Sequence, residues 1–345
     1  MHPMSELRTV EWVNGHVRMI DQTQLPERFG YVNLTNYRQV SKAIRTMIVR
    51  GAPAIGVAAA MGLALAAHAK RNRGRERILK ELEVAAEALR ASRPTAQNLF
   101  WAVDRVVLRA RKAGVSDDVA DVVVKEARKM AEEDVEASLS IGRYGADLIS
   151  DGDQVLTHCN TGTLATVSYG TALAPIRTAV RQGKRVRVIA TETRPRLQGA
   201  KLTTYELLSD KIPVTLIVDG AAGYVIRKGM VQKIMVGADR ITRNVVANKV
   251  GTYLIALAAH ANNIPFYVAA PTSTFDLRHG SEVKIEERDS KEVAYINGKR
   301  VPPKGVPVYN PAFDLTPVDL VRGFITEKGV FAPDSLAGQS MALQA

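Results

Sequence analysis

Five short apolar runs, separated by longer helical stretches, set the pattern of the second half of the sequence. They are QVLTHC (154–159), RVRVIATE (185–192), PVTLIVD (213–219), VQKIMVGAD (231–239) and PFYVAA (265–270). Runs rich in β-branched residues favour strands, and connections of a dozen or more residues are typical of parallel crossovers. The sequence therefore predicts an α/β fold whose C-terminal part is a Rossmann-like, doubly wound parallel sheet. The proline-containing tail after about residue 310 has little periodicity, and we expect it to wrap around this domain.

The first 150 residues have a different pattern, in which a short β-hairpin precedes a run of helices. Apolar residues flank Asn14-Gly15, the strongest short hairpin signal, within residues 9–21. Helical spacing then predicts helices over 37–49, 52–69 and 76–92, another from after Pro94 to Gly114, and one or two helices over 115–149. We expect two domains, a β-hairpin plus helical domain over 1–130 and an α/β catalytic domain over 131–345.

The apolar run over residues 52–69 is long enough to raise the question of a membrane span. It is mostly Ala and Gly and begins beside Pro53, so we interpret it as a buried, tightly packed helix. No apolar signal-peptide core follows the N-terminus, and the single cysteine suits a reducing compartment. These features predict a cytoplasmic protein that makes no contact with a membrane.

Composition narrows the classes of ligand. The formal net charge is +12, but the basic residues are scattered and aromatic residues make up only 6%. This pattern disfavours a nucleic-acid surface and is compatible with a small anionic substrate. The single cysteine excludes a cysteine-cluster metal site, and the six histidines lack paired ligand spacing. Because a P-loop and a strand–GxGxxG–helix motif are also absent, we expect neither a metal nor an organic cofactor.

Polar residues end three of the predicted strands: Cys159, Glu192 and Asp239. Taken singly, each is more often structural, since a lone cysteine usually packs as a small apolar residue and an aspartate often caps a helix. However, ligands of open parallel sheets bind outside the carboxyl ends of the strands. Because all three residues fall at one end of the same sheet, we predict a site there.

Three local patterns add detail to this site. We expect residues 164–176 to begin a helix, so that its dipole would favour a thiolate at Cys159. His158 should point away from Cys159 along the strand, and we interpret it as a packing residue or one that supports the site from behind, not as the partner of the thiol in a Cys–His dyad. Arginines beside the predicted helix starts at Gly51-Ala52 and Pro94, together with Lys249, suit a small anion bound between the domains.

Several longer motifs coincide with one family. They are VEWVNGHVRMIDQTQLP (10–26), MIVRGAPAIGVAAAMG (47–62), SRPTAQNLFWAVDR (92–105), LTHCNTGTLAT (156–166), ETRPRLQGAKLTTYEL (192–207), VGADRITRNVVANKVGTYLIALAAH (236–260), PTSTFD (271–276) and ITEKGVFAP (325–333). With these motifs the chain resembles the methylthioribose-1-phosphate isomerase family over nearly its whole length. The wider superfamily also holds ribose-1,5-bisphosphate isomerase and regulatory subunits of translation initiation factor 2B.

The resemblance implies roles for nine residues. Asp239 matches the general acid of the family and Cys159 its catalytic cysteine. The positions that hold the sugar phosphate in the family are matched by Arg50, Gly51, Ala52, Arg93, Gln198, Asn248 and Lys249. The implied reaction converts 5-methylthioribose 1-phosphate to 5-methylthioribulose 1-phosphate in methionine salvage, in a homodimer that pairs through the α/β domain.

Three points stay open at this level. The hydrogen at C2 could move as a proton removed by Cys159, or as a hydride whose transition state the thiol stabilises. The substrate could be ribose 1,5-bisphosphate, although the hairpin and the DQTQLP motif (21–26) resemble the methylthioribose branch. A non-catalytic regulatory subunit is the third alternative, which the retained acid and thiol argue against.

Overall fold

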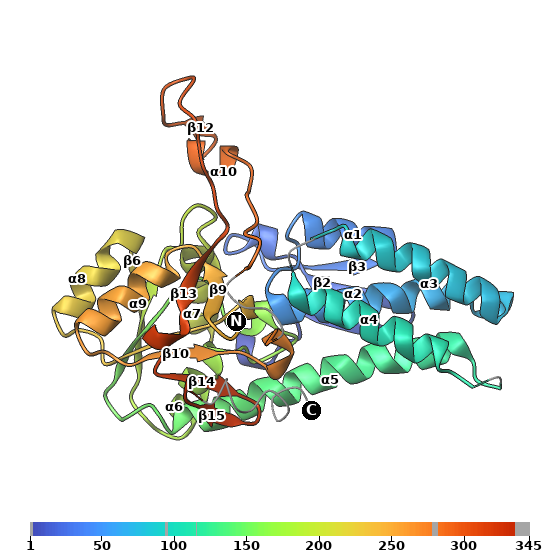
Figure 1. Cartoon of the computed structure of the whole chain (residues 1–345), viewed down its shortest axis with the longest axis horizontal. Helices are drawn as coiled ribbons and strands as arrows, with labels where there is room; N and C mark the ends of the chain where they lie inside the picture. Colours follow the sequence, from blue (N-terminus) through green and yellow to red (C-terminus); the bar gives the residue numbers. More distant parts are fainter. Residues whose placement is uncertain (1–2, 94–95, 115, 278–281, 335–345) are drawn as a thin grey trace.

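A computed structural model of the chain describes residues 3–93, 96–114, 116–277 and 282–334. Helices occupy one end of the molecule, and a sheet covered by helices occupies the other (Figure 1). A β-hairpin arm projects from the sheet end. The predicted combination of a helical N-terminal part and an α/β C-terminal part is confirmed.

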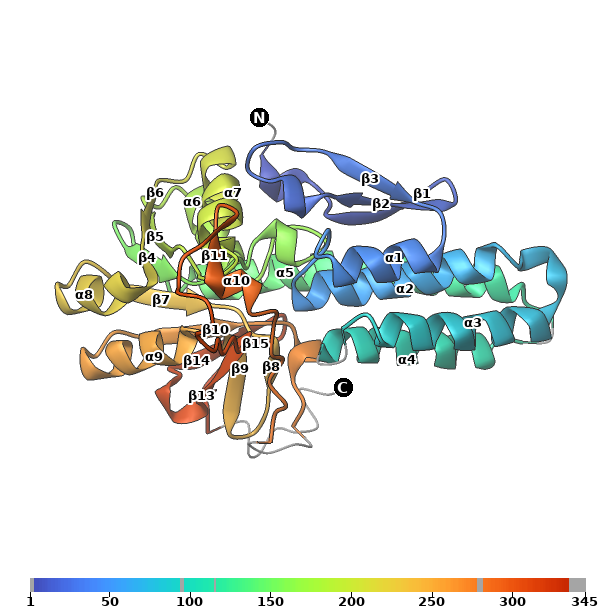
Figure 2. The ribbon, with the colours of Figure 1, turned by 90° about the horizontal axis from the view of Figure 1, so that it is seen from above.

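The N-terminal β-hairpin forms as predicted. Strands β1 (Val10–Val13) and β2 (His16–Ile20) pair antiparallel around Asn14 and Gly15, which have φ angles of 46° and 84°. A third strand, β3 (Tyr31–Leu34), pairs with β2 and was not predicted. The resulting small sheet lies over the first helices (Figure 2).

Five helices follow this small sheet. They are α1 (Tyr37–Arg45), α2 (Ala52–His68), α3 (Arg75–Arg90), α4 (Gln97–Arg111) and α5 (Val119–Ala146). Helix α2 is buried from Ala52 to Ala67 and contacts the other four, which confirms the prediction of a tightly packed apolar helix. In the described part of the chain, no helix combines the length and apolar character needed to cross a membrane.

Residues 119–146 form the single helix α5, where the sequence left one or two helices open. Gly142 and Gly145 lie within this helix, at positions where α6 (Leu173–Arg181) packs so closely that a side chain would not fit. A Cβ atom at Gly145 would come within 2.4 Å of the Pro175 side chain. Helix α5 runs continuously through residues 130 and 131, and the domain boundary that we placed there stays a prediction.

The main sheet has seven strands in the order β15-β14-β10-β7-β4-β5-β6, parallel except for β15. Their bounds are β4 (Gln154–Thr157), β5 (Arg187–Thr191), β6 (Val214–Ile217), β7 (Lys233–Val236), β10 (Phe266–Ala269), β14 (Gly323–Thr326) and β15 (Gly329–Phe331). The chain leaves β4 toward β5 and β6 on one side, and later returns to β7, β10 and β14 on the other. Strands β4 and β7 therefore flank the point where the winding reverses, which is where such sheets bind ligands.

Helices cover both faces of this sheet. Helices α5, α6 and α7 (Thr204–Ser209) pack on one face, where the core includes Val155 and Met235. Helices α8 (Ala222–Arg227) and α9 (Thr252–Ala261) pack on the other face against Leu156 and Ile234. Neighbouring residues of β4 and β7 thus point into opposite cores, as the alternation of a strand requires.

The tail does not simply wrap the domain, as we had expected. Its strand β14 joins the main sheet beside β10, and β13 (Phe313–Pro317) pairs antiparallel with β9 (Val245–Lys249). Strand β9 also pairs with β8 (Arg240–Ile241) in a second small sheet. The arm, defined as residues 282–312, carries α10 (Lys291–Ala294), β11 (Tyr295–Ile296) and β12 (Lys299–Arg300).

Candidate active site

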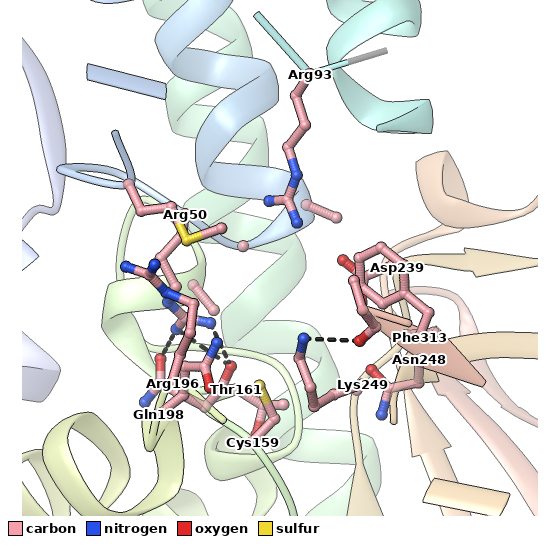
Figure 3. A pocket seen from close by; sticks show the side chains of 18 of the residues that line it. Arg50, Arg93, Cys159, Thr161, Arg196, Gln198, Asp239, Asn248, Lys249 and Phe313 are labelled. Atoms are coloured by element: carbon pink, nitrogen blue, oxygen red, sulfur yellow. Dashed lines mark hydrogen bonds between the residues drawn. The ribbon is translucent and has the colours of Figure 1, made fainter. Parts of the chain in front are cut away.

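A cavity lies at the carboxyl ends of β4 and β7, beneath the N-terminus of α2 (Figure 3). All nine residues that the family resemblance implied line it: Arg50, Gly51, Ala52, Arg93, Cys159, Gln198, Asp239, Asn248 and Lys249. Glu192 directly follows strand β5, but it is not among the described residues that line this cavity. The fold therefore gathers residues from both parts of the chain, and their chemical roles stay predictions at this point.

The backbone at Cys159 is held in an unusual conformation. Cys159 has a φ angle of 65°, in the left-handed region that non-glycine residues rarely adopt. It is buried, with 8% of its surface exposed. Its N–H donates to Thr193 Oγ1 at 2.9 Å, and its carbonyl accepts from Thr203 Oγ1 at 2.6 Å. Two hydroxyl groups from distant segments thus fix the peptide units on both sides of the thiol.

The predicted helix directly after this loop does not form. Residues Thr163–Ala165 make one 3₁₀ turn, and α6 begins only at Leu173. The amides of Thr163 and Leu164 donate instead to the carboxylate of Glu206, at 2.7 and 3.2 Å. Because a buried carboxylate takes these donors, the proposal that a helix dipole acts on Cys159 is wrong.

Glu206 belongs to a buried polar cluster that sequence analysis missed. Its carboxylate also accepts from Asn160 Nδ2 at 2.8 Å and pairs with Arg177 at 2.8 Å, and Arg177 pairs with Asp210 at 2.6 Å. Asn160 in turn accepts two bonds from the Arg50 guanidinium through its main-chain oxygen and a further one through its side chain. The cluster therefore connects Arg50, a predicted phosphate-binding residue, to the loop that follows Cys159.

We expect Glu206→Gln to lower the free energy of unfolding by about 3 kcal/mol, because it leaves part of a buried ion pair uncompensated. Urea unfolding followed by circular dichroism measures the change. Asp151→Asn, which breaks an exposed pair with Arg185, is the matched control and should stay near wild type. A Glu206→Gln variant as stable as this control would contradict the role assigned to the cluster.

Asp239 and Lys249 experience opposite effects of burial in the same cavity. Burial raises the pKa of Asp239, and the nearby cations Arg93, Lys249 and Arg50 only partly oppose this. Burial lowers the pKa of Lys249, whose Nζ donates to the Ala312 carbonyl at 2.7 Å. A carboxyl group with a raised pKa is suited to act as a general acid.

The lining of the cavity is strongly cationic. Five of its side chains are Arg or Lys (Arg50, Arg93, Arg196, Lys249 and Arg288), against two carboxylates (Asp239 and Glu292). Sequence analysis missed Arg196 and Arg288, because nothing in their local pattern distinguishes them from the scattered surface cations. This excess of positive charge suits a ligand that carries a phosphate.

His158 is buried and is not among the described residues that line the cavity, which agrees with the prediction of a packing or supporting residue. Its Nδ1 lies 2.6 Å from Thr191 Oγ1, and its Nε2 lies 2.9 Å from the Val250 carbonyl. A carbonyl can only accept, so Nε2 carries the proton and Nδ1 accepts from the threonine. Among the described residues, no three His, Cys, Asp or Glu side chains are placed to hold a metal ion.

Comparisons with known proteins identify the family of the chain. A sequence model of the Initiation factor 2 subunit family matches residues 48–333. The chain is 51% identical over 335 residues to a methylthioribose-1-phosphate isomerase of Geobacter metallireducens, covering 96% of this chain and 97% of that protein. It is 49% identical over 328 residues to the same-named protein of Thermosipho africanus, covering 94% and 95%. The chain belongs to the methylthioribose-1-phosphate isomerase family.

Solved structures share the fold of this family member along nearly its full length. The 5-methylthioribose 1-phosphate isomerase of Pyrococcus horikoshii OT3 superposes with a TM-score of 0.89 and 43% identity, covering 96% of both chains. A protein of A. fulgidus described as translation initiation factor eIF-2B, subunit delta, has a TM-score of 0.87 and 46% identity, covering 99% of this chain and 100% of that chain. One of these proteins is named as an enzyme and the other as a translation-factor subunit. The chemistry of the cavity must therefore decide between a catalytic and a regulatory function.

Proposed function

We infer that the chain is an aldose–ketose isomerase that converts 5-methylthioribose 1-phosphate to 5-methylthioribulose 1-phosphate. The observation that carries this inference is the meeting of an acid, Asp239, and a thiol, Cys159, in one cationic cavity. Full-length relatives at about half identity carry the name of this activity. A non-catalytic subunit would need neither group, so the cavity favours the enzyme over the regulatory alternative.

The chemistry follows from the phosphate on O1. Because this oxygen is esterified, the sugar ring cannot open through a free anomeric hydroxyl. We propose that Asp239 protonates the ring oxygen while the bond from that oxygen to C1 breaks. An aspartate can donate a proton near neutral pH only if its pKa is raised, and burial does raise the pKa of Asp239.

The second half of the reaction moves a hydrogen from C2 to C1, and two routes balance. In the first, the Cys159 thiolate takes the C2 proton as the ring opens, which leaves an enol at C1 and C2. The thiol then protonates C1, and the C2 hydroxyl returns its proton to the Asp239 carboxylate. In the second, hydride passes from C2 to the electron-poor C1, the C2 hydroxyl loses its proton to Asp239, and Cys159 stabilises the charge without bonding.

The proposed substrate is tested by assaying the purified protein with 5-methylthioribose 1-phosphate and ribose 1,5-bisphosphate in parallel, with product ketose followed by NMR. We expect kcat/KM to be at least about ten-fold higher for the methylthio sugar. Faster turnover of the bisphosphate would support the alternative substrate, and no turnover of either would support a regulatory subunit. Within the DQTQLP motif, Gln22 Oε1 accepts from Arg50 Nε at 3.2 Å, so this motif contacts a residue that lines the cavity.

We also propose that the enzyme is a homodimer that pairs through the α/β domain. Strand β6 is an edge of the main sheet, and large apolar side chains lie exposed on it, directly after it, and on helices α8 and α9: Leu216, Val218, Tyr224, Leu254 and Leu257. An apolar patch of this kind is typical of a surface that a partner covers. A cytoplasmic location is proposed because a free thiol at Cys159 suits a reducing compartment.

A further inference from the structure

Five charged side chains of alternating sign form a continuous ion-pair chain at the cavity. In order they are Arg93, Glu286, Arg288, Glu292 and Arg196. The N···O distances of its four links are 3.2, 2.9, 2.7 and 2.8 Å. Its two ends come from different parts of the fold, since Arg93 precedes α4 and Arg196 follows β5. The three middle residues belong to the arm, so the arm joins the helical part to the sheet part at the cavity.

The arm presents these residues by the alternation of an extended segment. Glu286 and Arg288 are half-buried, whereas Glu287 between them is exposed. The backbone here is anchored to the returning strand of the arm, through a bond from Arg288 N to the Asn310 carbonyl and one from Ala312 N to the Glu286 carbonyl. These two bonds hold the base of the arm so that Glu286 and Arg288 lie on its buried side, and Arg288 and Glu292 line the cavity.

Both ends of the ion-pair chain, Arg93 and Arg196, line the cavity, and Arg93 is the end held by Glu286. Glu286 contacts its Nε atom, and the guanidinium lies 5.8 Å from the centre of the Phe313 ring. Figure 3 shows the guanidinium directed down into the cavity. An arginine held through Nε presents its two terminal nitrogens in a fixed plane, the geometry that recognises phosphate oxygens in pairs.

We propose that Glu286, supported by Arg288, is a positioning residue that orients Arg93 for the substrate phosphate. This proposal rests on the proposed function, because it assigns Arg93 to the phosphate of that substrate. Glu286 acts only through Arg93 and does not touch the ligand. Phosphate binding in the cavity would then depend on Glu286 and Arg288 keeping their positions at the base of the arm.

The electrostatic surroundings favour the charged forms that this role requires. Burial opposes ionisation of Glu286, but Arg93 and then Arg288 outweigh it and lower the pKa of that carboxyl below its ordinary value. Burial likewise opposes the charge of Arg288, yet its hydrogen bonds to Glu292 and Glu286 raise its pKa. Side chains already ordered by one partner lose less conformational entropy to the next, so a chain of pairs holds its ends better than isolated pairs do.

The test compares Glu286→Gln with Glu287→Gln, the same chemical change one residue along the arm on its exposed side. We expect Glu286→Gln to raise the KM for 5-methylthioribose 1-phosphate about ten-fold with kcat nearly unchanged. Glu287→Gln should match the wild type. In an Arg93→Gln background the effect of Glu286→Gln should shrink below about two-fold, because the residue that it orients is gone. An undiminished effect in that background, or equal effects of the two glutamate variants, would overturn the proposal.

A binding measurement separates this proposal from the proposed function. Inorganic phosphate should slow alkylation of Cys159 by iodoacetamide in the wild type, and Glu286→Gln should need about ten-fold more phosphate for the same protection. This readout does not require turnover, so it tests Glu286 even if the sugar substrate is wrong. Equal phosphate requirements in the two proteins would overturn the positioning role, whereas loss of turnover alone would bear only on the proposed function.

Discussion

Replacing Asp239 with Asn is expected to lower kcat about a thousand-fold while leaving KM within about three-fold of the wild type. The amide has nearly the same shape and still fits between the cations of the cavity, but it cannot give up a proton to the ring oxygen. Asp153→Asn is the matched control, since Asp153 is a carboxylate of the same domain that pairs with Lys233 outside the cavity. Steady-state kinetics on both variants measures the difference.

The pH dependence of kcat/KM should also show that Asp239 acts as an acid. Because burial raises the pKa of Asp239, its proton-carrying form persists to a higher pH than that of an exposed aspartate. The acid form is present below that pKa, so kcat/KM should fall as the pH rises through it. An Asp239→Asn variant with substantial activity, or one that keeps the alkaline limb of the wild-type profile, would remove the acid assignment.

Cys159→Ser is expected to lower kcat about a hundred-fold or more. A hydroxyl is far less acidic than a thiol and less polarisable, so it can neither take the C2 proton nor stabilise a migrating hydride as well. Because Cys159 is the only cysteine in the sequence, iodoacetamide should add a single mass to the chain as activity is lost. Substrate should slow this reaction, and Asp239→Asn should still be alkylated.

An unchanged kcat in Cys159→Ser would exclude the thiol from the reaction. Turnover of the wild type in D₂O then separates the two routes. Deuterium at C1 of the product indicates that the hydrogen passed through an exchangeable thiol, whereas retention of the substrate hydrogen indicates a hydride shift.

The fold class could be predicted because its signals are local. Each of the five apolar runs contains a strand of the main sheet, and the helix at 52–69 is buried as its composition requires. The strands of the tail could not be predicted in the same way. Strand β14 has four residues, and its place in the sheet depends on pairing with β10, about 55 residues earlier in the chain.

The position of the site was also foreseeable in part. Cys159 and Asp239 follow strands that are parallel and adjacent, so their place at one edge follows from topology alone. The loop after Cys159 was predicted wrongly, because its amide donors bond to Glu206, which lies more than forty residues away. A local pattern contains no trace of that acceptor, so helix propensity misled the prediction.

The sequence by itself therefore determined the alternation of strands and helices, the edge of the sheet at which the candidate site lies, and the family. Only the tertiary structure decided which charges face one another: Glu206 with Arg177, and Arg93 with Glu286, 193 residues apart. The reason is physical. Periodicity and chain direction act over a few residues, whereas burial, ion pairing and the pKa of Asp239 depend on groups that meet only once the sheet and the arm have assembled.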